Sequence, residues 1–109
     1  SRPAAGYFQV RIEGDRGALV SVTSPHAARV EMHETTASGA TSGMRRLEGI
    51  PVRAGETLTF APAGRHLMVF EIDRRIPAGG RLDLVLHFER GAPVTVPAVL
   101  VPTGGDVGP

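Results

Sequence analysis

The sequence predicts an all-β domain, an antiparallel β-sandwich or barrel of about eight short strands. Apolar and polar residues alternate over most of the short runs that are rich in Val, Leu, Ile, Thr and Phe, and this alternation is typical of strands with one buried face. Fourteen Gly and nine Pro residues separate these runs and mark turns. No segment keeps a helical period over several turns, so helices are not expected.

The expected strands follow one another along the whole chain. They are Tyr7–Ile12, Leu19–Thr23, Arg29–Thr35, Gly43–Leu47, Thr57–Phe60, His66–Phe70, Arg81–Phe88 and Val94–Val101. Turns are expected between them, where Gly, Pro, Ser and charged residues gather: Glu13–Gly17, Ser24–His26, Ala37–Ser42, Arg53–Glu56, Pro62–Arg65 and Pro77–Gly80. The clearest pattern is in Arg81–Phe88, where Leu82, Leu84, Leu86 and Phe88 share one face and Asp83, Val85 and His87 share the other. This strand is expected to have one buried and one wet side.

At 109 residues the chain is expected to form one domain over residues 1–102. The remaining stretch, 103–109, is Gly/Pro-rich and offers little to bury, so a flexible tail is expected there. The net charge is +1, from 12 basic residues, all of them Arg, and 11 acidic ones. This balance gives no electrostatic reason to expect nucleic acid or an anionic membrane as a partner.

The chain has no cysteine, which excludes disulfides, thiolate metal sites and a Cys nucleophile. A metal protein without thiols fits an oxidising compartment. No apolar run has transmembrane length. Because the sequence begins with Ser1, a removed upstream segment is expected, and a membrane anchor could have been lost with it.

Histidine and methionine form a spaced pattern on the expected strands. In the strand around His33, alternation places Val30 and Met32 on the core face, and Glu31 and His33 on the other. His66 and Met68 likewise share one face of their strand, with Cα atoms roughly 6–7 Å apart, so both can reach one ion. Thioether and imidazole groups together suit a soft ion, and Cu(I) is the ion that this chemistry favours.

Each of these residues also has an ordinary structural interpretation. Met44 lies between the Gly/Ser-containing stretch that ends at Gly43 and two Arg residues, and it fits a ligand or a gap-filling side chain equally well. His33 alone would be a surface residue beside two carboxylates. His26 in a turn and His87 on a wet strand face are expected to be plain surface residues. The metal site therefore depends on the combination.

The frame His33-x10-Met44-x21-His66-x-Met68 resembles the copper-site motif of the periplasmic PCu(A)C copper chaperones. The similarity covers roughly residues 4 to 101. It includes Ala4–Phe8, Val30–Thr35, Pro62–Met68, Arg74–Gly80 and Leu82–Phe88, which resemble the family's opening strand, first ligand strand, His-x-Met turn and strand, following turn and Leu-rich strand. The chain departs from the family where Arg46 and Leu47 replace a second Met, where Arg65 replaces a Tyr, and where Val69 and Phe70 replace further Met residues.

The resemblance implies a cupredoxin-like, Greek-key β-sandwich that binds one Cu(I) through His33, Met44, His66 and Met68, with Cu(II) also possible. It implies a shallow site near the surface. The Gly and Ser content of the stretch before Met44 suggests a loop that opens for release, and the departures from the family suggest a basic collar of Arg45, Arg46 and Arg65 around the site. The resemblance further implies a monomeric periplasmic or cell-surface carrier that delivers copper to the CuA subunit of cytochrome c oxidase or to a Sco-type assembly factor, or that scavenges copper.

Two other classes of function are a metal-free binding module and an enzyme. A metal-free β-sandwich for adhesion or assembly would leave the His and Met residues incidental. An enzyme is not expected, because the sequence has no Ser-His-Asp arrangement with a nucleophile turn, no phosphate-binding loop and no metalloprotease helix.

Overall fold

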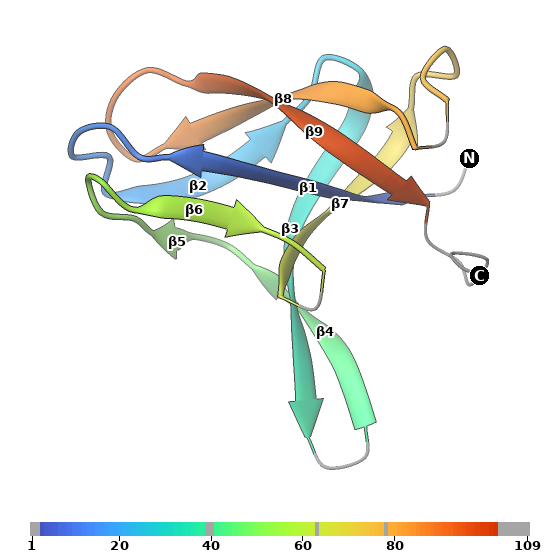
Figure 1. Ribbon diagram of the computed structural model, residues 1–109, viewed down its shortest axis with the longest axis horizontal. Coiled ribbons are helices and arrows are strands. Elements are labelled where there is room, and N and C mark those ends of the chain that lie inside the picture. The colour runs from blue at the N-terminus through green and yellow to red at the C-terminus, as the bar shows by residue number, and fades with distance from the viewer. Residues whose placement is uncertain (1–2, 39–40, 63, 78, 103–109) are drawn as a thin grey trace.

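The computed structural model describes residues 3–38, 41–62, 64–77 and 79–102, and the tail expected at 103–109 lies outside them. The described part is all strand and loop (Figure 1). Its strands are β1 (Ala4–Arg11), β2 (Ala18–Thr23), β3 (Ala27–Ser38), β4 (Thr41–Leu47), β5 (Ile50–Pro51), β6 (Thr57–Phe60), β7 (Arg65–Ile72), β8 (Arg81–Phe88) and β9 (Val94–Pro102). The described residues contain no helix long and apolar enough to span a bilayer.

The predicted strands are confirmed. Arg81–Phe88 and Thr57–Phe60 have the predicted bounds, the others differ by one to three residues at an end, and the two-residue β5 is additional. The turn predicted at Ala37–Ser42 is wrong over most of its length, because Ala37 pairs with Ser42 and Ser38 with Thr41. Gly and Ser suggested a loop, but Thr35, Thr36 and Thr41 are β-branched and favour strand, so β3 and β4 continue as a hairpin.

All strand pairs are antiparallel, and the order across the sheet is β4-β3-β7-β1-β9-β8-β2-β5. β1 changes partners along its length: Ala4–Gly6 pair with β7 and Ala4–Tyr7 with β9, whereas Phe8–Arg11 pair with β6. A strand that passes from one sheet to another makes a corner of a sandwich. The core lies inside, and its most buried large side chains are Phe60, Leu19, Ile50, Leu58, Leu67, Leu84, Leu86 and Val69.

The far parts of β3 and β4 leave the body as a two-stranded arm (Figure 1). β3 pairs with β7 over Ala27–Glu34 and with β4 over Met32–Ser38. The arm therefore begins beside Arg65, the first residue of β7, which pairs with Glu34, at the point where all three strands meet. Side chains from three strands converge at this point.

Glu71 has a φ of 54° and, of the described residues other than Gly, it alone has a positive φ. An exposed residue with a Cβ is strained in this region. We expect Glu71→Gly to raise the free energy of unfolding by about 0.5–1 kcal/mol, since strain of roughly 1–3 kcal/mol is relieved and part is offset by the entropy of Gly in the unfolded chain. Urea unfolding would measure this. Glu48→Gly, at an exposed position without a positive φ, should lower stability, and a loss at both positions would contradict the strain.

Candidate metal centre

The register of β3 with its two neighbours places the four predicted ligands on one face. His33 lies opposite His66 of β7, and Thr35 lies opposite Met44 of β4. Residues directly opposite each other point to the same side of a sheet, and so do residues two apart on one strand. Met68, opposite Glu31, therefore joins His33, Met44 and His66 on this face, which we call the metal face.

The opposite face of the same strands belongs to the core. Met32 lies opposite Leu67, and both are buried in the core cluster. The prediction that Met32 packs in the core is therefore confirmed. The two methionines of β3 and β4 differ in role because alternation sends Met32 inward and Met44 to the metal face.

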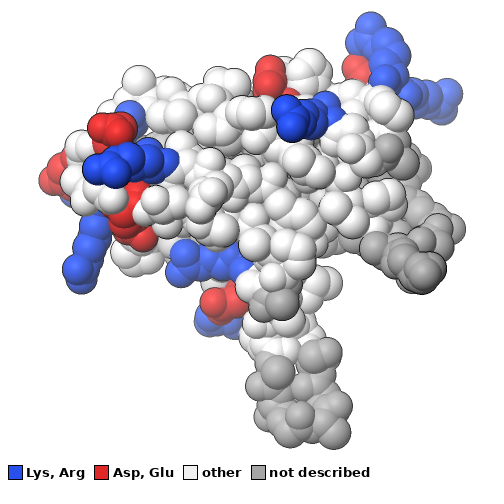
Figure 2. All heavy atoms as spheres, viewed as in Figure 1, with Lys and Arg blue, Asp and Glu red and all other residues white. Residues whose placement is uncertain are grey.

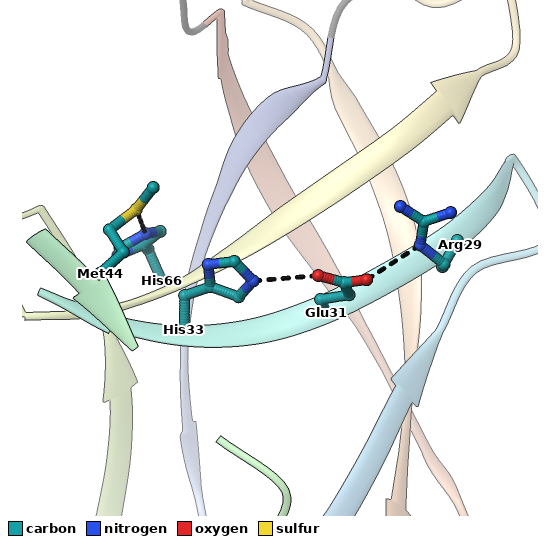
Figure 3. Close-up of polar contacts among 5 residues, drawn as sticks. All are labelled: Arg29, Glu31, His33, Met44 and His66. Atoms are coloured by element: carbon teal, nitrogen blue, oxygen red, sulfur yellow. Dashed lines mark hydrogen bonds and ion pairs between the residues drawn. The ribbon is translucent and has the colours of Figure 1, made fainter. Parts of the chain in front are cut away.

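His66 and Met44 are in direct contact. His66 Nε2 lies 2.9 Å from Met44 Sδ, and the rings of His33 and His66 have centroids 5.9 Å apart (Figure 3). The other nitrogen of His66, Nδ1, lies 3.3 Å from the carbonyl oxygen of Gly64. A carbonyl oxygen and a thioether sulfur both only accept, so the neutral ring donates to one of them and keeps a lone pair on its other nitrogen. With the proton on Nδ1, the lone pair of Nε2 lies beside Met44 sulfur, where one cation can bind both atoms.

His33 is held in a complementary way. Its Nε2 lies 3.0 Å from Glu31 Oε1, and its Nδ1 is buried without a hydrogen-bond partner among the described residues. The ionised carboxylate only accepts, so Nε2 donates and the neutral ring leaves its lone pair on Nδ1. A buried acceptor atom without a hydrogen-bond partner costs stability unless a donor or a cation binds to it. Each imidazole thus offers one unprotonated nitrogen.

Glu31 is itself anchored. Arg29 Nε donates to Glu31 Oε2 at 3.0 Å, and the Arg29 guanidinium lies over the Phe70 ring, 4.1 Å from its centroid. The hydrogen bond from His33, together with the charges of Arg46 and Arg29, holds the pKa of the Glu31 carboxyl below its usual value against the opposing effect of burial. The carboxylate therefore stays ionised at neutral pH and keeps accepting from His33.

Burial differs sharply among the four residues. His66 is 7% exposed and Met68 8%, and the His33 side chain is 16% exposed, whereas Met44 is 58% exposed. Three members of the set are thus embedded between neighbouring strands. Met44, on the outer strand of the sheet, is the member that solvent and a partner can reach.

The predicted basic collar is wrong for two of its three arginines. Arg45 and Arg65 both lie opposite Glu34, which is on the face of β3 away from His33, because side chains alternate along a strand. Arg45 Nη2 donates to Glu34 Oε1 at 2.6 Å, and this bond, with a smaller effect of Arg65, lowers the pKa of Glu34. Of the three arginines of the predicted collar, only Arg46, which lies opposite His33, is on the metal face. Figure 2 likewise shows arginine and carboxylate groups side by side near the base of the arm.

The remaining histidines lie apart from the metal face. His87 is on β8, and its Nε2 lies 2.7 Å from Oγ1 of Thr23 on β2. His26 lies in the turn before β3. Within the described ranges, no three His, Asp or Glu side chains are grouped so that they could hold a metal.

Comparison with known proteins supports this fold. The family described as "Putative lipoprotein LpqE-like" matches residues 1–100. The "Putative lipoprotein Lxx21020" of Leifsonia xyli subsp. xyli (strain CTCB07) is 34% identical over 97 residues, which cover 85% of this chain and 58% of that protein. The chain thus spans a little over half the length of this relative.

Solved structures of similar fold include the copper-bound PCuAC domain from PmoF2, with a TM-score of 0.63 and 26% identity over 89% of this chain and 76% of that one. The apo PCuAC domain from PmoF1 has a TM-score of 0.61 at 21% identity, over 91% of this chain and 79% of that one, which is a likeness of fold alone. These matches confirm the cupredoxin-like β-sandwich. With the family match over residues 1–100, they show that the chain belongs to the LpqE-like family and shares the PCuAC domain fold.

Proposed function

We propose that this protein is an extracytoplasmic copper carrier that binds one Cu(I) through His33, Met44, His66 and Met68. The observation that carries the proposal is the contact of His66 Nε2 with Met44 Sδ at 2.9 Å, which brings an imidazole nitrogen and a thioether sulfur within reach of one ion. His33 and Met68 share the face on which they meet. Thioethers favour Cu(I) over harder ions, and neutral imidazoles add affinity without adding charge.

The fold comparison supports copper as the ion. The PmoF2 domain, 26% identical to this chain, is described as copper-bound. The set of two nitrogens and two sulfurs in this chain has the soft character that Cu(I) requires. Copper is here a cargo and not a cofactor, and we infer a binding and transfer protein without catalytic activity.

The uneven burial of the ligands suggests how the ion leaves. A ligand from an acceptor can approach on the side of Met44, which is 58% exposed, and displace its sulfur while the buried ligands still hold the ion. Because Met44 lies within β4, the loop opening that its sequence context suggested is replaced by rotation of an unbranched side chain. The exchange then leaves the strand pairing intact.

The setting is inferred from the relatives. The matching family and the Leifsonia protein are both described as lipoproteins, which supports a location outside the cytoplasm on a membrane anchor. In that location the acceptor that we propose is the CuA subunit of cytochrome c oxidase or a Sco-type assembly factor. Scavenging of copper is the alternative use of the same site.

Anaerobic titration with Cu(I) in the presence of a chromogenic Cu(I) chelator tests the proposal. The protein should withdraw one equivalent of Cu(I) from the chelator, and it should retain no Zn²⁺ in a parallel titration. Mixing the loaded protein with a copper-free CuA domain would then separate delivery from scavenging. Failure to compete for any Cu(I) would leave the sandwich as a metal-free adhesion or assembly module.

A further inference from the structure

We propose that Glu31, held by Arg29, is a positioning residue that orients His33 so that Nδ1 is its metal ligand, while His66 binds through Nε2. This inference rests on the proposed function and deepens it. It assigns a role to two residues outside the four-ligand frame. It also makes the two histidines unequal, because they present different ring atoms to the ion.

The orientation follows from a chain of contacts along the metal face. The Arg29 guanidinium lies 4.1 Å from the centroid of the Phe70 ring. Arg29 Nε donates to Glu31 Oε2 at 3.0 Å, and Glu31 Oε1 accepts from His33 Nε2 at 3.0 Å (Figure 3). With Nε2 occupied, only Nδ1 of His33 is left, and it is the buried nitrogen without a partner among the described residues. The ring is therefore fixed at one end by a carboxylate and left open at the other.

The burial of the pair makes the contact effective. The side chains of Glu31 and His33 are 17% and 16% exposed, so the hydrogen bond is shielded from water on most sides. A carboxylate behind a metal-binding imidazole fixes the tautomer and raises the basicity of the ring, and loss of such a partner typically lowers metal affinity about 10–100-fold. His66 has a weaker, neutral partner in the Gly64 carbonyl at 3.3 Å.

Glu34 supplies a matched comparison. It lies three residues from Glu31 on the same strand and is likewise paired with an arginine, Arg45. However, it points to the opposite face, where its register partners are Arg45 and Arg65. Removal of Glu34 changes the charge of the strand as removal of Glu31 does, but it leaves His33 untouched.

Nitrogen-15 NMR of the histidine side chains tests the assignment, with Cu(I) and then Ag(I) as the probe because ¹⁰⁹Ag couples directly to a bound ¹⁵N. We expect the metal signal on Nδ1 of His33 with Nε2–H retained, and on Nε2 of His66 with Nδ1–H retained. Metal on Nε2 of His33, with binding otherwise intact, would overturn the inference alone. The absence of any His or Met shift on metal addition would overturn the proposed function itself.

Affinity measurements give a second test. Glu31→Leu should weaken Cu(I) binding about 10–100-fold, and Glu34→Leu should leave it unchanged. Glu31→Gln retains an acceptor oxygen of the same reach, so it should bind Cu(I) more tightly than Glu31→Leu, which a role of the charge or of the fold alone would not produce. Equal losses in the two leucine variants, or no recovery with Gln, would refute the positioning role.

Discussion

His66→Ala is expected to lower the Cu(I) affinity by at least about 100-fold, more than the loss typical of an outer-sphere partner. His66 is central to the candidate site: its Nε2 contacts Met44 Sδ, and its ring lies 5.9 Å from that of His33. The substitution removes a proposed ligand and also the group that Met44 sulfur contacts. Competition with a Cu(I) chelator under reducing, anaerobic conditions would measure the change.

The other histidines provide the controls. His33→Ala should show a loss of similar size, whereas His26→Ala and His87→Ala should retain wild-type affinity, because they lie in a turn and beside Thr23. Since His66 is 7% exposed, thermal unfolding of each metal-free variant would show that loss of binding is not loss of the fold. A large decrease in affinity at position 26 or 87 would mean that the ligand set is wrongly assigned.

Replacing each methionine with leucine should give three different results from one chemical change. Met68→Leu removes a thioether embedded in the metal face and should lower Cu(I) affinity on the order of 100-fold, while conserving most of the side-chain volume. Met44→Leu should accelerate copper release to a chelator most, because Met44 is the exposed member of the proposed ligand set. Met32→Leu should change neither the Cu(I) affinity nor the rate of copper release, since Met32 packs in the core.

The measurements are equilibrium competition for affinity and stopped-flow transfer to a chromogenic chelator for release. Met32→Leu controls for the general effect of removing a sulfur from the chain. If Met32→Leu weakened binding as much as Met68→Leu, the division of the strands into a core face and a metal face would not govern copper binding.

Strand alternation made most of the fold and of the site predictable. Arg81–Phe88 has its predicted bounds, and the three leucines of its apolar face are buried. The same rule, applied to the sequence, predicts that Glu31 and His33 share one face of their strand. What it could not provide was register: whether His33 lies beside His66 depends on pairing between β3 and β7, which are separated by about thirty residues of chain.

The two wrong predictions, the basic collar and the loop before Met44, also arose because the sequence does not reveal which strands pair and in what register. The basic collar grouped Arg45, Arg46 and Arg65 by their nearness to ligands in the sequence, but alternation and cross-strand pairing send Arg45 and Arg65 to the Glu34 side. The loop before Met44 was predicted from Gly and Ser content, which does not account for the pairing of Thr41 with Ser38. The spacing of Glu31 and His33 in the sequence already indicated that the two side chains could meet. The support of Arg29 by Phe70 could not be predicted, because it depends on the pairing of β3 with β7.

The site is built on the outside of a core that is complete without it. Leu67 and Met32, directly behind the metal face, belong to the apolar interior, so the architecture does not depend on a bound ion. In small zinc domains, in contrast, much of the metal-binding free energy is used to fold the chain. In the proposed carrier, almost all of the binding free energy would remain available for partitioning the ion between donor and acceptor, and the protein would be ready for another cycle of loading once the ion has left.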